Sequence, residues 1–305
     1  MPFLPVSLFC LSNCPDSQRY SAGLKQLRSA GFAVQEPPLP VPRLRQFAGD
    51  DAYRGADFNR AVSEEPSGGL LMAVRGGSGA ARALPYIDFA ALKRSGKIVC
   101  GYSDTTALLL AAAARGCTRL LHGPMLCSSW TLPPDSPQFQ RELDSFAAVL
   151  RGGRELLPGW ARPVILHSGK ATGNLFAANL TLLETLIGTP YLPDLTGAIL
   201  VVEDVNAPAH DIDRKLNHLR QAGILECLSA LMFGSFTDAE DGEFIPEIEE
   251  EYASYVHGPV LAGFPVGHDH PSITIPCNRL AALDVSADVP VSLRLEDPLQ
   301  QYPLD

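Results

Sequence analysis

Short apolar segments alternate with amphipathic stretches through the first half of the chain. Apolar runs of strand length predict buried strands at 6–10, 32–35, 69–74 and 98–100. Helical spacing between and after them predicts helices at 18–30, 57–63, 80–94, 104–115 and 136–150. Pro85 is expected to bend or break the third helix. Strands that alternate with helices are typical of parallel βαβ units, so we expect an α/β domain with a parallel sheet over residues 1–155.

The second half contains more strand-like runs and fewer helical ones. Strands are predicted at 198–202, 230–236, 260–264, 273–275, 281–285 and 291–295. Helices are predicted at 173–187 and 211–222. Residues 151–163 combine glycine and proline with little periodicity, as a connection between domains does. We therefore expect a linker at 156–172 and a β-rich C-terminal domain at 173–305.

The composition fits two globular domains and argues against several classes of partner. Of the 305 residues, 46% are hydrophobic and 19% are charged, which suffices for a sizeable core. A net charge of -10 argues against nucleic acid and against an anionic membrane surface, because both require clustered lysine and arginine. No apolar run approaches the ~20 residues that span a bilayer. The apolar start at 6–10 lacks the basic flank of a signal peptide.

Seven cysteines are scattered along the chain, and Cys10 and Cys14 form the one close pair. A zinc site of this kind needs a second pair, so we predict no metal and no other cofactor. Scattered cysteines in odd number are typical of reduced thiols, and we expect a cytoplasmic protein.

The most informative stretch is residues 97–115. The predicted strand ends at Gly101, and strong helix formers begin at Asp104. Ser103 is therefore expected at a corner between strand and helix, where its hydroxyl is exposed and the next N–H points over it, as in a nucleophile elbow. The simpler interpretation is that Ser103 caps the helix. The signature G-x-S-x-G is also incomplete, because Thr105 stands in its last position.

The glycine-rich loop Arg75-Gly-Gly-Ser-Gly79 follows the strand at 69–74 and allows three interpretations. It resembles a dinucleotide loop, but Arg82 occupies the place of the third glycine. It can be a plain turn. It can also form a nest of backbone N–H groups directed at a carbonyl oxygen, since glycine has no side chain that blocks the approach. The carboxyl ends of parallel strands share one edge of the sheet, so this loop and Ser103 can face one crevice.

Candidate bases and acids lie mostly in the second half. The segment Gly267-His-Asp-His270 offers two histidines, and the strand at 198–202 ends in Glu203 and Asp204. A catalytic triad needs one histidine, an acid that orients it and a hydroxyl such as that of Ser103.

Two further arrangements stay open at this point. Histidines two residues apart point the same way on a strand, so a metal site at His268, Asp269 and His270 is conceivable, although a further ligand is not evident. His122 is another candidate base, with a packed turn residue as the simpler interpretation.

Ten short motifs occur in one order along nearly the whole chain: Phe47-Ala-Gly49, Ala73-Val-Arg-Gly-Gly-Ser-Gly-Ala-Ala-Arg82, Ile87-Asp88, Gly101-Tyr-Ser-Asp-Thr-Thr106, Gly123-Pro-Met125, Gly173-Asn-Leu175, Leu200-Val-Val-Glu-Asp-Val205, Ala222-Gly-Ile-Leu225, Gly234-Ser-Phe236 and Gly267-His268. Together they resemble the LD-carboxypeptidase family of serine peptidases, which includes muramoyl-tetrapeptide carboxypeptidases and microcin C self-immunity peptidases. One such match arises easily by chance, whereas ten in order do not.

The resemblance implies Ser103 as the nucleophile, Glu203 as the orienting acid and His268 as the base, because His268 follows glycine in the Gly-His motif. It also implies an oxyanion hole formed by the backbone N–H groups of Gly77 and Asp104. The active site would lie between an α/β N-terminal domain and a β-rich C-terminal domain, usually in a homodimer.

The substrate implied is a murein tetrapeptide, from which D-alanine is released in cell-wall recycling. Its terminal carboxylate needs a cationic or N–H-rich anchor, for which Arg75 and Arg82 are candidates, with a structural ion pair as an equal alternative for Arg82. Asn174, expected at a helix start, is a candidate substrate contact or a helix cap. The alternatives are a self-immunity peptidase acting on an aminoacyl-nucleotide, a non-catalytic small-molecule binding protein and a metal hydrolase.

The chain departs from the family pattern at three places. Ser78 stands where the loop usually carries tyrosine, and Leu11-Ser-Asn-Cys14 stands where Pro-Ser-Gly is expected. Cys277 and Asn278 replace Leu-Gly after Pro276. None of these is a triad residue, and all are candidates for a change of specificity.

Overall fold

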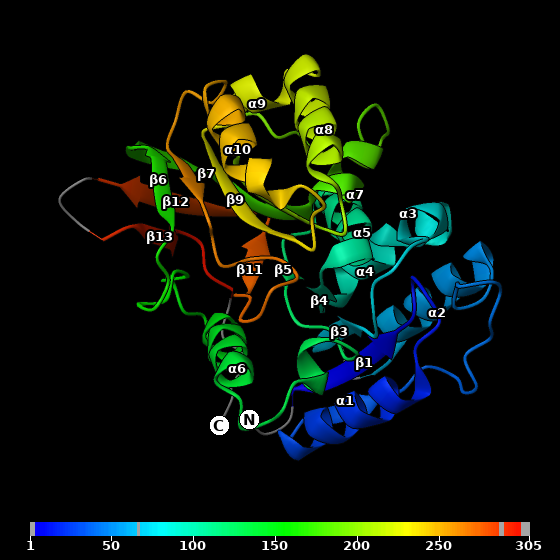
Figure 1. The fold of residues 1–305 in the computed structure, drawn as a ribbon. Helices are drawn as coiled ribbons and strands as arrows, with labels where there is room; N and C mark the ends of the chain where they lie inside the picture. The colour runs from blue at the N-terminus through cyan, green and yellow to red at the C-terminus, as the bar shows by residue number, and fades with distance from the viewer. Residues whose placement is uncertain (1–3, 66–67, 287–289, 300–305) are drawn as a thin grey trace.

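The computed structural model describes residues 4–65, 68–286 and 290–299, which form two sheets (Figure 1). The first sheet has the strand order β2-β1-β3-β4-β5-β11. Its strands are β1 (Pro5–Phe9), β2 (Ala33–Gln35), β3 (Leu70–Ala73), β4 (Ile98–Gly101), β5 (Leu120–His122) and β11 (Ile275–Cys277). The first five are parallel, whereas β11 comes from the second half of the chain and pairs antiparallel with β5.

Helices cover both faces of the first sheet, as expected for parallel βαβ units. They are α1 (Ser17–Ser29), α2 (Asp51–Ser63), α3 (Ala80–Ala83), α4 (Phe89–Ser95) and α5 (Thr106–Ala113). Helix α1 lies on one side of the sheet and α4 and α5 on the other, because the strand order reverses between β1 and β3 (Figure 1). Ligands of such sheets bind at the carboxyl ends of the strands beside this reversal. The predicted break at Pro85 is confirmed, since α3 ends at Ala83.

The second sheet has the strand order β13-β12-β7-β8-β9-β10-β6. Its strands are β6 (Val164–His167), β7 (Gly169–Asn179), β8 (Ile199–Val205), β9 (Ala230–Thr237), β10 (Val260–Ala262), β12 (Arg279–Val285) and β13 (Ser292–Leu295). The helices of this half are α7 (Leu180–Thr185), α8 (Ala209–Gln221), α9 (Ile224–Cys227) and α10 (Ile245–Ala253), and α6 (Pro137–Leu150) precedes them. Helices α8 and α10 cover one face of the sheet (Figure 1). The predicted fold class, a parallel α/β domain followed by a β-rich domain, is confirmed.

The helix predicted at 173–187 is wrong. Residues up to Asn179 belong to β7, and only Leu180–Thr185 are helical. Ala171, Gly173 and Leu175 are buried while the residues between them are exposed, which is the alternation of a strand. Strand β7 pairs with both β8 and β12, and this pairing outweighs the helix preference of its alanines and of Leu175.

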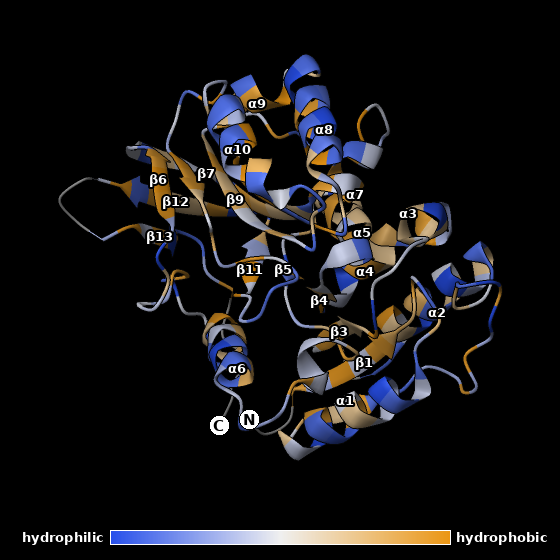
Figure 2. Cartoon of the chain, in the orientation of Figure 1, coloured by the Kyte–Doolittle hydropathy of each residue, from blue (hydrophilic) through white to orange (hydrophobic). Residues whose placement is uncertain are grey.

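Helix α5 has no polar face. All eight of its residues are buried, because it packs against β5 on one side and against α7 and β7 on the other. Hydrophobic residues gather in the strands of both sheets, whereas the outer helices α1 and α8 carry hydrophilic residues (Figure 2). Helix α5 therefore fixes the residues at its N-terminus, including Ser103, where the two halves meet.

Candidate active site

Ser103 lies at a sharp corner, as predicted. Strand β4 ends at Gly101, the 3₁₀ turn η2 (Ser103–Thr105) follows, and α5 begins at Thr106. Ser103 has φ of 59°, a left-handed conformation that is costly for a residue with a Cβ. The side chain of Ser103 caps neither helical segment. This geometry favours the elbow over the capping interpretation.

The loop after β3 packs directly on this corner. A Cβ added to Gly76 would lie 2.8 Å from the Oγ of Ser103, so only glycine permits the approach. The carboxylate of Asp104 holds the loop, since its Oδ2 accepts a hydrogen bond of 2.8 Å from the N–H of Ala80. Burial raises the pKa of Asp104, and its hydrogen bonds oppose this shift. Gly77, with φ of 123°, is exposed at the surface of the same loop.

Glu203 and His268 meet through a hydrogen bond. The Nδ1 of His268 lies 2.7 Å from the Oε2 of Glu203, whose side chain is fully buried. Burial raises the pKa of Glu203, and the hydrogen bond from His268 lowers it. Asp204, the other candidate acid, follows on a strand and points elsewhere, toward Lys215 at 3.1 Å and the side-chain amide of Asn179 at 2.9 Å. Glu203 is therefore the acid that contacts the histidine.

Tyr102 connects the corner with this acid–histidine pair. Its ring centroid lies 5.0 Å from that of His268 and 5.7 Å from that of His122. His122 is buried at the end of β5, and its Nε2 lies 4.0 Å from the free carboxylate oxygen of Glu203. Burial and the neighbouring His268 lower the pKa of His122 to about 3, so it is neutral at physiological pH. Ser103 follows Tyr102 directly in the chain.

The three predicted substrate contacts have different surroundings. Arg75 lies in the loop and donates to the carbonyls of Gly76 and Cys14 at 3.0 and 3.4 Å. Arg82 forms an ion pair with Asp51 at 2.8 Å. Asn174 lies within β7 opposite Leu280, not at a helix start, so its capping interpretation is wrong. It is about 17 Å along the strand from the residue that pairs with Glu203, and the structure does not bring it to the other site residues.

Sequence reasoning missed several residues of this region. Glu142 on α6 contacts His270, with 2.5 Å between its Oε1 and the histidine Nδ1. It stands three residues after Phe139 and four before Phe146, so it lies on the apolar face of the helix. A carboxylate on that face was the feature of the sequence from which a buried partner could have been predicted. His268 and His270 therefore contact different carboxylates. Among the described residues, no three His, Cys, Asp or Glu side chains gather as a metal ion would require.

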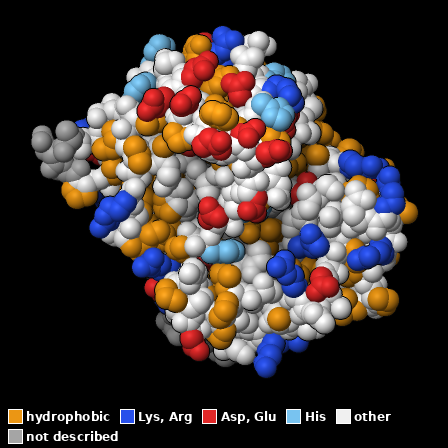
Figure 3. All heavy atoms as spheres, in the orientation of Figure 1, with side chains coloured by type: hydrophobic (Ala, Val, Ile, Leu, Met, Phe, Trp, Pro, Cys, Tyr) orange, Lys and Arg blue, Asp and Glu red, His pale blue; other side chains and the backbone are white. Residues whose placement is uncertain are grey.

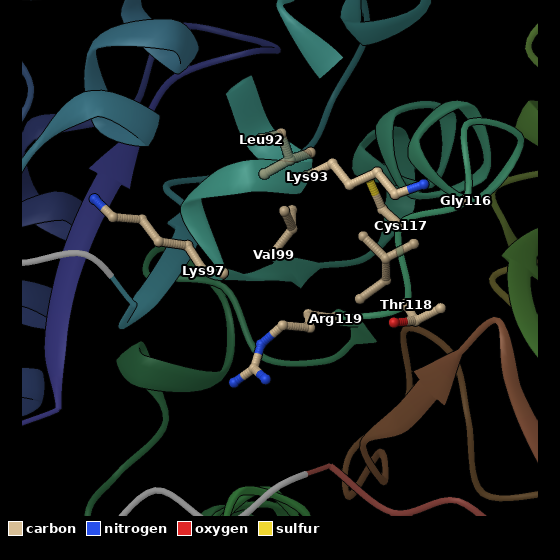
Figure 4. A pocket seen from close by; sticks show the side chains of 10 residues that line it. Leu92, Lys93, Lys97, Val99, Gly116, Cys117, Thr118 and Arg119 are labelled. Carbon is tan, nitrogen blue, oxygen red and sulfur yellow. The ribbon is translucent and has the colours of Figure 1, made fainter. Parts of the chain in front are cut away.

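A separate cavity of about 220 Å³ lies at the opposite end of the first sheet. Its lining includes Lys97 and Val99 at the amino end of β4, whereas Ser103 follows the carboxyl end of that strand. The cationic side chains around the cavity do not converge on one point. Lys97 extends away from it and donates to the carbonyls of Ala61 and Glu64 (Figure 4). This cavity does not belong to the site around Ser103.

The surface differs between the two halves of the chain. Acidic side chains gather over the upper part of the molecule, which includes the acidic segment 238–251, and a histidine side chain is visible at the hollow below them (Figure 3). Helices of the described residues include none that is long and apolar enough to cross a bilayer. All seven cysteines are free thiols.

Models of two protein families match most of the chain. Residues 6–123 match the LD-carboxypeptidase N-terminal domain, and residues 172–283 match the LD-carboxypeptidase C-terminal domain. Together they include the corner at Ser103, the loop before it, and both Glu203 and His268.

Characterised proteins are similar over nearly the whole chain. The murein tetrapeptide carboxypeptidase of Pseudomonas aeruginosa is 31% identical over 290 residues, which are 92% of each chain. The microcin C7 self-immunity protein MccF of Escherichia coli is 28% identical over 87% of this chain and 85% of its own. The crystal structure of muramoyltetrapeptide carboxypeptidase from Oxalobacter formigenes superposes with a TM-score of 0.82 at 26% identity, covering 96% of this chain and 99% of the other.

Proposed function

Because the chain belongs to the LD-carboxypeptidase family, we propose that it is a serine carboxypeptidase that releases terminal D-alanine from murein tetrapeptides in the cytoplasm. The observation that carries the proposal is the hydrogen bond of 2.7 Å between His268 and the buried Glu203, together with the strained corner at Ser103 and the ring contact of its neighbour Tyr102 with His268. The similarity to a murein tetrapeptide carboxypeptidase supports the substrate class.

In the proposed reaction, the Oγ of Ser103 attacks the carbonyl carbon of the amide that precedes D-alanine, and its proton passes to the Nε2 of His268. Glu203 accepts the Nδ1–H of His268 and stabilises the imidazolium. The N–H groups of Gly77 and Asp104 bind the oxyanion, where loss of a single donor typically costs about 10²–10³ in rate. His268 then protonates the departing amine, and D-alanine leaves. Water activated by His268 hydrolyses the acyl-enzyme.

Arg75 is the better candidate for the terminal carboxylate of the substrate. It lies next to Gly76, which packs closely on Ser103, and it donates hydrogen bonds to the neutral carbonyls of Gly76 and Cys14. The charge of Arg82 is matched by Asp51. A cation that already has a carboxylate partner gains less from a second one, so we assign the anchoring role to Arg75.

The test is D-alanine release from a muramoyl tetrapeptide by the unmodified chain, by Ser103→Ala and by Ser29→Ala, which removes an exposed hydroxyl on α1. We expect release by the first and by the Ser29 variant, and a loss of at least about 10⁴-fold with Ser103→Ala. Equal release by Ser103→Ala would show that the elbow is not the nucleophile. If none of the three releases D-alanine, the substrate assignment is wrong, and an aminoacyl-nucleotide is the next compound to test.

A further inference from the structure

A second acid–histidine pair joins helix α6 to the loop that carries His268. Glu142, which is 3% exposed, extends from α6 toward this loop. Its Oε1 lies 2.5 Å from the Nδ1 of His270 and accepts a hydrogen bond of 3.0 Å from the N–H of Ser272. Because a buried carboxylate is costly unless its oxygens are hydrogen-bonded, these contacts tie the loop to α6.

Ser272 in turn holds Gly267, the residue that precedes the proposed base His268. The Oγ of Ser272 accepts a hydrogen bond of 3.1 Å from the N–H of Gly267. Gly267 has φ of 143° and is packed closely, since an added Cβ would lie 2.1 Å from the Oγ of Ser235. Its peptide therefore has little freedom once Ser272 is fixed, and His268 follows it directly.

A neighbouring contact holds the far end of the same loop. One turn further along α6, the Oγ of Ser145 accepts a hydrogen bond of 3.0 Å from the N–H of Thr274. Helix α6 belongs to the first half of the chain, whereas the loop belongs to the second. The position of His268 thus depends on side chains that α6 supplies.

The cavity beside the pair is too small for a substrate. Glu142 and His270 line a cavity of about 10 Å³ together with Tyr102 and His122, and this volume holds about one water molecule. A peptide cannot enter it, so we expect Glu142 to influence the reaction through the loop.

We propose that Glu142 is a positioning residue: through Ser272 and Gly267 it sets the orientation of His268 toward Glu203 and the reacting serine. This inference rests on the proposed function for its kinetic consequence but not for its geometric one. A displacement of about 1 Å in such a site can cost about 10²-fold in rate.

The experiment compares four variants with the unmodified protein. Glu142→Ala removes the tie, Glu142→Gln keeps an acceptor oxygen of the same shape, and Ser272→Ala removes only the link to Gly267. Asp144→Asn removes an exposed carboxylate from the same helix and is the control. We expect kcat for tetrapeptide hydrolysis to fall about 10- to 100-fold in Glu142→Ala and Ser272→Ala with KM within threefold. Glu142→Gln should recover most of this loss, and the control should be unchanged.

A second readout is independent of the substrate. The proton of the His268 Nδ1, hydrogen-bonded to Glu203, gives a low-field NMR signal, which we expect to shift or broaden in Ser272→Ala and Glu142→Ala but not in Asp144→Asn. An unchanged signal in folded Ser272→Ala and Glu142→Ala, with unchanged kcat, overturns the proposal. A displaced signal in a protein that does not hydrolyse the tetrapeptide supports the positioning role and refutes only the substrate assignment.

Discussion

Gly76 provides the most direct test of how closely the loop approaches the proposed nucleophile. Its backbone φ lies outside the left-handed region, so alanine can adopt the same conformation. In Gly76→Ala, however, the new Cβ would lie 2.8 Å from the Oγ and 2.9 Å from the Cβ of Ser103. Comfortable separations between such atoms begin at about 3.5 Å, so the Ser103 side chain or the loop must move by roughly half an ångström or more.

The size of the effect follows from this displacement. A shift of about 1 Å at reacting atoms can cost about 10²-fold, so we expect kcat to fall about 10- to 100-fold in Gly76→Ala. Overpacking of this kind costs about 1–3 kcal/mol of folding stability, which a chain of this size tolerates.

The assay is steady-state D-alanine release with a urea unfolding curve for each variant. Gly159→Ala is the matched control, since an added Cβ there meets nothing within 4 Å. The reasoning is refuted if Gly76→Ala is folded and keeps the kcat of the unmodified protein. It is also refuted if Gly159→Ala loses as much activity as Gly76→Ala.

Two further predictions concern charged side chains. Arg75→Ala should raise KM for the tetrapeptide about 10- to 100-fold, because a hydrogen bond to a charged group is lost. Arg82→Ala should raise KM less than threefold, and the reverse ranking would assign the anchor to Arg82. Glu249 is 8% exposed on α10, and burial raises its pKa to about 7. The folded state therefore holds this proton more tightly than the unfolded state, so stability falls as pH rises from about 4.5 to 7, by at most about 3 kcal/mol. Glu249→Gln should be more stable than the unmodified chain at pH 8 and no more stable at pH 4.5, and urea curves that show no such difference would contradict the assignment.

Local patterns in the sequence were sufficient for β1 to β4 and for the corner at Ser103, because these strands are short apolar runs. Strand β5 was not predicted, and the place of β11 in the first sheet was not either, because that place depends on pairing with a distant segment. The helix expected at 173–187 failed because β7 is specified by its partners: β8 and β12 are distant in sequence, and their pairing is not visible in the composition of the segment. Propensity is a weak guide where such long-range contacts compete with it.

In the candidate site, too, local motifs were predicted from the sequence, whereas contacts between distant elements were not. Family motifs indicated Ser103, Glu203 and His268, and the structure adds the hydrogen bond between the last two. The choice of Glu203 over Asp204 depends on which face of β8 each side chain occupies; the residue pattern left that choice open, and only the family resemblance favoured Glu203. Glu142 was missed because its partner, His270, lies on another element and no local pattern connects them.

Strand β11 has a consequence for the synthesis of the protein. Until residues 275–277 leave the ribosome, the nascent chain exposes the open edge of β5, and such an edge is a site where chains associate wrongly. His268 stands shortly before this segment in the chain, so the proposed triad cannot assemble until much of the second half has been synthesised. A product that terminates before residue 275 should therefore keep the edge of β5 open and be prone to aggregate.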